Sequence, residues 1–180
     1  MEKSSIDSLD FVEENIKYTR NAINEAAVKA GRNADDIRLM AVTKTVPPAL
    51  VNRAFQCGIR LMGENRVQEF LEKRPFLDMN GREAHLIGHL QTNKVKYLMG
   101  MAKMMQSLDR MALAQEIDRR AQAAGLVMPV LVQVNIAREP QKAGVVEEEI
   151  EAFIRSAAKL PGLSVEGLMA IMPLTADQEA

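Results

Sequence analysis

The residue with the clearest capacity for chemistry is Lys44, which ends an apolar run in the segment AVTKT. A lysine whose stem lies in a protein interior is partly desolvated, and this favours the neutral form of its amine. A neutral lysine amine can attack an aldehyde carbon and form a Schiff base. The alternative is a lysine that leaves the strand and simply reaches solvent.

Polar residues also follow other apolar runs. Asn65, in GENRVQEF, can donate and accept hydrogen bonds and so could orient an imine or a phenolic oxygen, although an Asn before a helix is more often an N-cap. His85 and His89 flank the run in HLIGHL, on one face by the strand period of two. They could form a proton relay or bind a metal. Alternatively, one packs in the interior and the other caps the turn.

A weaker indication of a binding site follows the run PVLVQVNI. Asn135 ends this run, and the loop after it carries Arg138 and Lys142. Two cations in one loop could bind an anion, but charged loops are usually only solvated.

The elements that must position these residues are predicted from hydrophobic periodicity. A long amphipathic helix is expected over residues 4–30, because apolar residues recur at helical spacing, namely Leu9, Val12, Ile16, Ile23 and Ala27. Short apolar runs follow, and these are IRLMAV, RLMG, AHLIG, MMQSL, PVLVQVNI and LSVEGLMAIM. Further helices are expected over residues 48–56, 66–73, 92–99, 110–124 and 146–160. Strands that alternate with helices at this spacing indicate parallel β/α units.

Two architectures fit such a repeat, an open doubly wound sheet and a closed (β/α)8 barrel. The segment AVTKTVPPAL has no glycine-rich phosphate turn after the first run, which disfavours the open sheet. The barrel places polar residues at the carboxyl ends of its strands, where barrel active sites are built; these are Lys44, Asn65, His89, Ser107 and Asn135. Only about six β/α units are recognisable, whereas a closed barrel needs eight. The predicted fold is therefore a TIM-type α/β barrel that is apparently incomplete and has an extra N-terminal helix: either the chain is a fragment or the fold departs from the barrel at its end.

Composition excludes several classes of function. A net charge of −1 from interspersed charges gives no basic field for nucleic acid or for an anionic membrane. Cys57 is the only cysteine and there are two histidines, so neither an intrachain disulfide nor a thiolate metal cluster is expected. No apolar stretch approaches the length of a membrane span, and the first residues are too polar for a secretory signal. We therefore expect a single cytoplasmic domain over residues 1–180.

Several segments together resemble, in order and separation, the pyridoxal phosphate homeostasis proteins, stand-alone relatives of the alanine racemase N-terminal barrel. They are AVTKT, GENRVQE, HLIGHLQTNK, SLDR, VQVNIAREPQKAG and GLMAIMP, between about residues 37 and 173. The resemblance implies that pyridoxal 5′-phosphate (PLP) is held as a Schiff base on Lys44 and that Asn65 lies near the cofactor ring. It also implies phosphate-binding turns after the seventh and eighth strands. The sequence ends before both turns, so weak retention of the cofactor is expected.

Two functions compete under this resemblance, beside a third reading in which the chain is a barrel fragment that binds no cofactor. The first is a PLP-binding protein that buffers or delivers the cofactor by reversible exchange at Lys44, with PLP-dependent apoenzymes among its possible partners. The second is an amino-acid racemase of the alanine racemase type, which needs an acid or base on each face of the cofactor. In two-domain racemases the second group is a tyrosine from another domain. Tyr18 and Tyr97 are the only tyrosines here and both fall in predicted outer helices, so a carrier is favoured over an enzyme.

Overall fold

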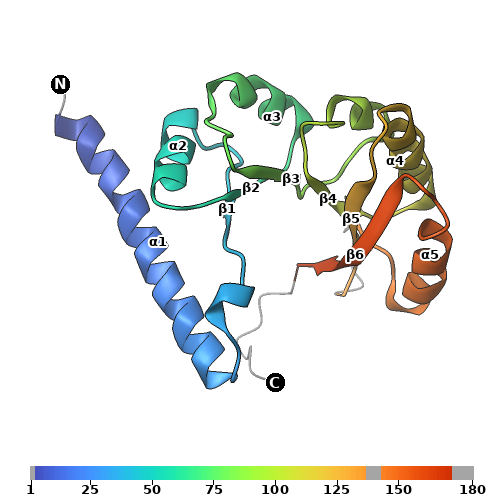
Figure 1. Cartoon of the computed structure of the whole chain (residues 1–180), viewed down its shortest axis with the longest axis horizontal. Coiled ribbons are helices and arrows are strands. Elements are labelled where there is room, and N and C mark those ends of the chain that lie inside the picture. The colour runs from blue at the N-terminus through green and yellow to red at the C-terminus, as the bar shows by residue number, and fades with distance from the viewer. Residues whose placement is uncertain (1–2, 137–142, 172–180) are drawn as a thin grey trace. The chain divides into compact units, whose positions relative to one another are not determined.

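The computed structural model describes residues 3–136 and 143–171 (Figure 1). The chain divides into two compact units. The first comprises Met1–Glu64 and Gln68–Ala84, and the second comprises Asn65–Val67 and His85–Ala180.

The first unit holds the long N-terminal helix and the first two strands. Its elements are α1 (Lys3–Lys29), the 3-10 turn η1 (Ala34–Asp36), β1 (Met40–Val42), α2 (Pro48–Gln56), β2 (Leu61–Glu64), most of α3 (Val67–Lys73) and η2 (Arg74–Phe76). Strand β3 (Glu83–Leu86) begins here and ends in the second unit.

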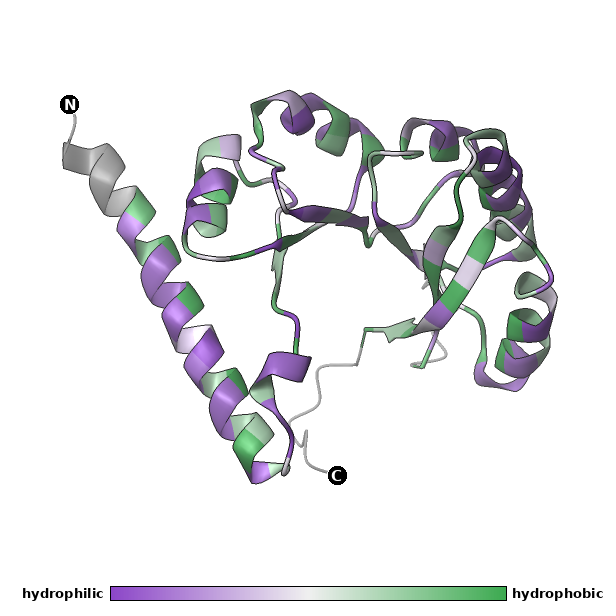
Figure 2. Cartoon of the chain, viewed as in Figure 1, coloured by the Kyte–Doolittle hydropathy of each residue, from purple (hydrophilic) through white to green (hydrophobic). Residues whose placement is uncertain are grey.

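Helix α1 is amphipathic as predicted, and its polar and apolar residues alternate along the ribbon in Figure 2. The residues of the predicted apolar stripe that are described are half-buried or, at Ala27, buried. Two polar contacts tie α1 to the segment that contains α2. Arg53 donates to the carboxylate of Glu13 at 2.8 Å, and Arg20 donates to the carbonyl of Gly58 at 2.9 Å.

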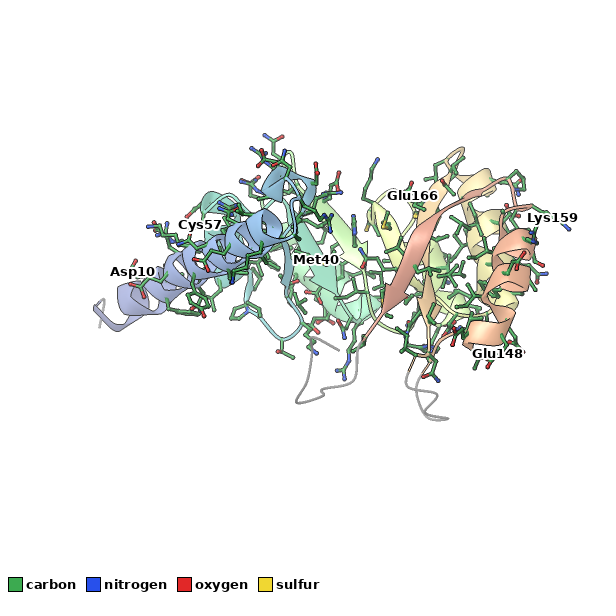
Figure 3. All side chains as sticks on the ribbon, turned by 90° about the horizontal axis from the view of Figure 1, so that it is seen from below. Asp10, Met40, Cys57, Glu148, Lys159 and Glu166 are labelled. Atoms are coloured by element: carbon green, nitrogen blue, oxygen red, sulfur yellow. The ribbon has the colours of Figure 1, made fainter. Side chains whose placement is uncertain are left out.

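The second unit contains the rest of the strands. Its remaining elements are η3 (Thr92–Tyr97), β4 (Met104–Leu108), α4 (Met111–Ala123), β5 (Met128–Val134), η4 (Glu147–Glu149), α5 (Ile150–Ala157) and β6 (Leu163–Ala170). Glu148 and Lys159 lie at opposite ends of the segment that contains α5 (Figure 3).

The strands follow one another in the sheet in sequence order, β1-β2-β3-β4-β5-β6. The pairings β1–β2, β3–β4, β4–β5 and β5–β6 are all parallel. Sequence order and parallel pairing are what a (β/α) barrel requires of its strands. The expected TIM-type fold with about six β/α units is therefore confirmed.

The segment predicted as a helix over residues 92–99 is instead a 3-10 helix, η3. Val95 and Leu98 are both fully buried. A spacing of three residues places side chains above one another in a 3-10 helix, which has three residues per turn. The prediction of an α-helix was wrong here because apolar spacings of three occur in both kinds of helix.

Ile117, in the middle of α4, is fully buried in the core of the second unit. We expect Ile117→Ala to lower the free energy of unfolding by about 2–5 kcal/mol, because the lost methyl groups leave a cavity. Val127 is 56% exposed, so Val127→Ala should change it by about 0.5 kcal/mol or less. Urea denaturation of both variants checks this, and equal losses would contradict the assigned core.

Among the described residues, no helix combines the length and the apolar character needed to cross a bilayer.

Candidate functional site

A tight turn follows β1 and carries Lys44 at its second position. We call residues 43–46 the lysine turn. The amide of Thr43 donates to the carbonyl of Gly63 at 2.9 Å, which extends the pairing of β1 with β2, and the amide of Val46 donates to the carbonyl of Thr43 at 3.0 Å. Helix α2 then begins at Pro48, whose ring suits a first helical position. Lys44 therefore lies at the carboxyl end of β1, as predicted.

The side chain of Lys44 is exposed, and its ammonium forms no hydrogen bond or ion pair with another described residue. The expectation that Lys44 is partly desolvated is therefore not met by the described part of the chain. The two residues before Lys44 differ in exposure: Val42 is 50% exposed and Thr43 only 2% exposed. This alternation follows the strand period of two, in which successive side chains face opposite sides.

A second lysine, Lys73 at the end of α3, contacts this turn, and its ammonium is bonded to three acceptors. Its buried ammonium donates to the carbonyl of Thr43 at 2.5 Å, to Glu64 Oε1 at 2.7 Å and to Glu69 Oε1 at 2.6 Å. Burial lowers the pKa of the Lys73 ammonium, but its hydrogen bonds to Glu64 and Glu69 outweigh burial and raise the pKa above its ordinary value. Lys73 therefore stays protonated and unreactive at neutral pH.

Thr45, directly after Lys44, has a positive φ of 61°. A β-branched residue rarely adopts this left-handed region, and such strain costs about 1–3 kcal/mol. The conformation is supported by a hydrogen bond from the amide of Thr45 to Glu69 Oε1. The hydroxyl of Thr45 also donates to the carbonyl of Lys44 at 2.6 Å.

Asn65 follows β2 and belongs to the second unit, where its backbone packs against Gly88, two residues beyond the end of β3. A Cβ added to Gly88 would lie 2.2 Å from the carbonyl oxygen of Asn65, so only glycine permits this approach. Ser107 of β4 donates to the carbonyl of Gly88 at 2.6 Å. The side-chain oxygen Oδ1 of Asn65 is buried and accepts no hydrogen bond from the described residues. Asn65, Gly88 and Ser107 thus come together within the second unit, where Asn65 Oδ1 is left as an acceptor that no described residue uses.

The two histidines have separate environments. His85 is buried in β3, and its Nδ1 lies 2.8 Å from Nε2 of Gln106. His89 has a side chain that is 56% exposed, and its Nδ1 lies 3.3 Å from Oδ2 of Asp109. The described residues contain no group of three or more His, Cys, Asp or Glu placed to hold a metal ion. His85 is thus the interior histidine of the second alternative, whereas the described contact of His89 is with Asp109 and is not a cap of the turn.

Asn135 lines a pocket of about 420 Å³ at the carboxyl ends of β5 and β6. The pocket is mostly apolar and includes Ile136, Ile150 and Leu168. Arg138 and Lys142, the two cations of the neighbouring loop, lie outside the described residues.

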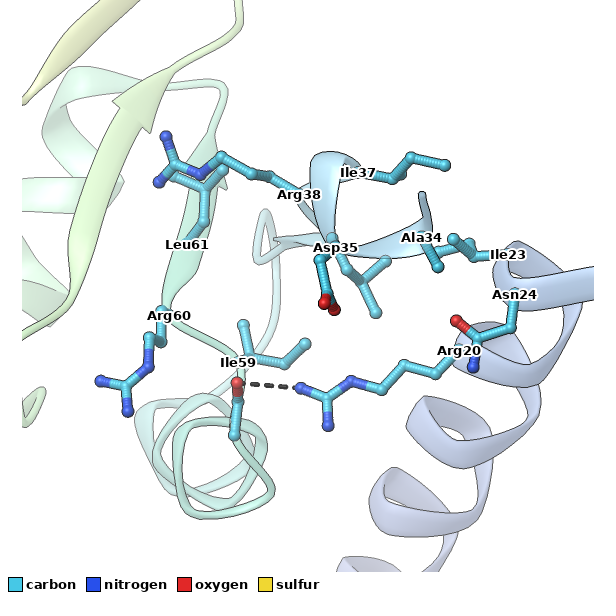
Figure 4. Close-up of a pocket in the computed structure, with 12 residues that line it drawn as sticks. Arg20, Ile23, Asn24, Ala34, Asp35, Ile37, Arg38, Ile59, Arg60 and Leu61 are labelled. Atoms are coloured by element: carbon cyan, nitrogen blue, oxygen red, sulfur yellow. Dashed lines mark hydrogen bonds between the residues drawn. The ribbon is translucent and has the colours of Figure 1, made fainter. Parts of the chain in front are cut away.

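A larger pocket of about 640 Å³ lies in the first unit and is lined by three arginines, Arg20, Arg38 and Arg60 (Figure 4). Arg20 donates to the carbonyl of Gly58, and Arg38 pairs with Glu83 at 2.5 Å. This pocket lies at the amino-terminal ends of β1 and β2, whereas Lys44 follows the carboxyl end. Active sites of (β/α) barrels are built at the carboxyl ends, so the size of this pocket does not make it the candidate site.

Sequence reasoning missed the cluster of Glu64, Glu69 and Lys73. One available signal was the spacing of Glu69 and Lys73, four residues apart on one helix face. The other was a glutamate at the end of a fully buried strand, since a buried carboxylate requires a partner.

Comparison with known proteins places these features in a family. The family model for the alanine racemase N-terminal domain matches residues 8–180. A pyridoxal phosphate homeostasis protein of Aquifex aeolicus is 42% identical over 166 residues, which cover 92% of this chain and 73% of the relative. One of Pseudomonas aeruginosa is 36% identical over 172 residues, which cover 96% of this chain and 75% of the relative.

Solved structures agree with the sequence matches. PipY of Synechococcus elongatus with PLP bound superposes with a TM-score of 0.73 at 32% identity, covering 85% of this chain and 71% of PipY. An alanine racemase of Clostridium difficile superposes with a TM-score of 0.68 at 16% identity, covering 89% of this chain and 41% of the racemase. That identity shows a shared fold alone. The chain belongs to the family of the pyridoxal phosphate homeostasis proteins, within the broader group that shares the alanine racemase N-terminal domain.

Proposed function

We propose that this protein binds PLP as a Schiff base on Lys44 and takes part in PLP homeostasis, with Asn65 at the cofactor. One observation carries the assignment of the lysine. Two lysines lie near the carboxyl end of β1. The ammonium of Lys73 donates to three acceptors, whereas the ammonium of Lys44 bonds to none of the described residues.

The residues present fit the chemistry that PLP brings. The aldehyde of PLP condenses with a neutral primary amine to form a Schiff base and release one water. Lys44 supplies an amine that solvent and cofactor can reach, and Asn65 supplies a buried oxygen that accepts no hydrogen bond from the described residues. An amide side chain can both accept and donate, which suits the orientation of a polar ring substituent.

The relatives support the same reading. PipY was solved with PLP bound, and the curated relatives carry the name of homeostasis proteins. We infer that this chain has the same role, as a carrier that releases PLP to cytoplasmic apoenzymes. We also propose that residues 1–180 form one barrel domain.

A carrier is favoured over a racemase. The relatives at 36–42% identity are named homeostasis proteins and not racemases. A two-base racemase needs a second group opposite the lysine. Tyr18, on α1, is 77% exposed, and Tyr97, at the end of η3, is 42% exposed. Neither tyrosine lies at the carboxyl end of a described strand, and this supports a carrier over a racemase.

The proposal is tested by comparing PLP with pyridoxine 5′-phosphate, which carries an alcohol in place of the aldehyde. We expect PLP to bind about tenfold more tightly or better, because only the aldehyde can bond to Lys44. Equilibrium ultrafiltration of the full chain with each compound measures the difference. Equal affinity for the two compounds would contradict a covalent role for Lys44.

A further inference from the structure

We propose that Lys73, together with Glu69, is a positioning device that holds the lysine turn in the conformation that presents Lys44. The part that concerns PLP rests on the proposed function, but the part that concerns the conformation of the turn does not.

The first tie of this device is direct. Lys73 Nζ donates to the carbonyl of Thr43, and the same carbonyl closes the turn by accepting from the amide of Val46. The hydroxyl of Thr43 donates to Glu64 Oε1 at 2.7 Å, and Glu64 Oε1 also accepts from Lys73. The residue before Lys44 is therefore fixed through both its backbone and its side chain.

The second tie runs through a carboxylate. Glu69 Oε1 accepts from Lys73 and also from the amide of Thr45. Thr45 is the residue held at a φ of 61°. A strained backbone conformation persists only where its surroundings impose it. Glu69 is bonded in turn to Lys73, so the buried ammonium of Lys73 contacts the residue before Lys44 directly and the residue after Lys44 through Glu69.

Helix α3, which carries Glu69 and Lys73, is also held by the packing of an apolar side chain. Phe70 of α3 is 2% exposed. A buried ion pair adds little net stability over apolar packing, and fixing one specific conformation is among its better supported uses. What the cluster adds beyond the packing of α3 is therefore the geometry of the lysine turn.

Glu69→Ala is the sharpest test, because it removes the acceptor of the Thr45 amide and leaves Lys73 paired with Glu64. Replacement of Lys73 itself would leave buried carboxylates without a cation and could unfold the protein. Glu69→Gln keeps an acceptor oxygen and serves as the conservative rescue. Glu72→Ala is the matched control, because Glu72 is an exposed glutamate on the same helix whose carboxylate accepts from Gln68, outside the turn.

Two readouts follow on the full chain. The first is amide hydrogen exchange at Thr45 without PLP, which we expect to rise about tenfold in Glu69→Ala and to stay near wild type in Glu69→Gln and Glu72→Ala. The second is the rate at which borohydride traps PLP on Lys44, which we expect to fall about tenfold in Glu69→Ala alone, since misplaced reacting groups react more slowly.

The outcomes separate the two proposals. If wild type traps no PLP on Lys44, the proposed function fails, and the exchange of the Thr45 amide still decides whether Glu69 holds the turn. If Glu69→Ala leaves that exchange at the wild-type level, the positioning role is overturned. A trapping rate that falls equally in Glu69→Ala and Glu72→Ala would also overturn it, because the effect would then belong to α3 as a whole.

Discussion

Lys44→Ala is expected to abolish covalent attachment of PLP to this protein. After incubation with excess PLP and borohydride reduction, wild type should carry a phosphopyridoxyl group on the peptide that contains Lys44, and the variant should show at least about a twentyfold loss of this label over the whole protein. The physical reason is that the reaction needs a primary amine, and Lys73, the other lysine beside β1, is protonated and surrounded by acceptors. Mass spectrometry of the digested protein measures the loss.

Two control variants separate the amine from other properties of lysine. Lys44→Arg keeps the positive charge but offers no comparable nucleophile, so it should lose the adduct as fully as alanine. Lys159→Ala removes an exposed lysine beyond α5 (Figure 3) and should leave the adduct unchanged. Persistent labelling in Lys44→Ala at a level like that of wild type would place the cofactor lysine elsewhere.

Gly88→Ala is expected to have the second large effect, on stability and on the site together. The added Cβ would lie 2.2 Å from the oxygen and 2.6 Å from the Cα of Asn65, and both atoms belong to the backbone. A contact of this length forces the two segments apart, with a loss of about 1–3 kcal/mol or more in the free energy of unfolding. Because the displaced segment carries Asn65, PLP binding should weaken as well. Urea denaturation and ultrafiltration measure the two effects.

Gly100→Ala is the control for a glycine that is required only by its backbone conformation. Gly100 has a φ of 73° and no heavy atom within 4 Å of an added Cβ, so its replacement should cost about 1 kcal/mol of backbone strain and leave PLP binding unchanged. If Gly88→Ala costs no more than Gly100→Ala and binds PLP normally, Asn65 is not held by this contact.

The elements of the fold were predictable because they follow local periodicity. Strand β5 alternates between buried and half-buried residues along its whole length, and the predicted stripe of α1 is its less exposed face. Two predicted helices differ in kind. The first is η3, because Val95 and Leu98 have a spacing that α and 3-10 helices share. The second is the start of the helix expected over residues 146–160, which is the 3-10 helix η4.

The position of Lys44 at a strand end was also predictable, but the contacts that hold it were not. Thr43 and Lys73 are 30 residues apart in sequence, and no local pattern reports a contact of that range. The same is true of Gly88, whose need for glycine arises from the backbone of Asn65 and not from its own φ. Whether Asn65 contacts PLP remains a prediction.

The alternation of exposed Val42, buried Thr43 and exposed Lys44 has a consequence for changes in chain length. Substitutions within β1 leave this alternation in phase, whereas the deletion or insertion of one residue would exchange the two faces beyond it. The lysine would then point toward the carboxylates that Lys73 neutralises, and the threonine would take the exposed place. The length of the chain from β1 to Lys44 should therefore tolerate less variation than its composition.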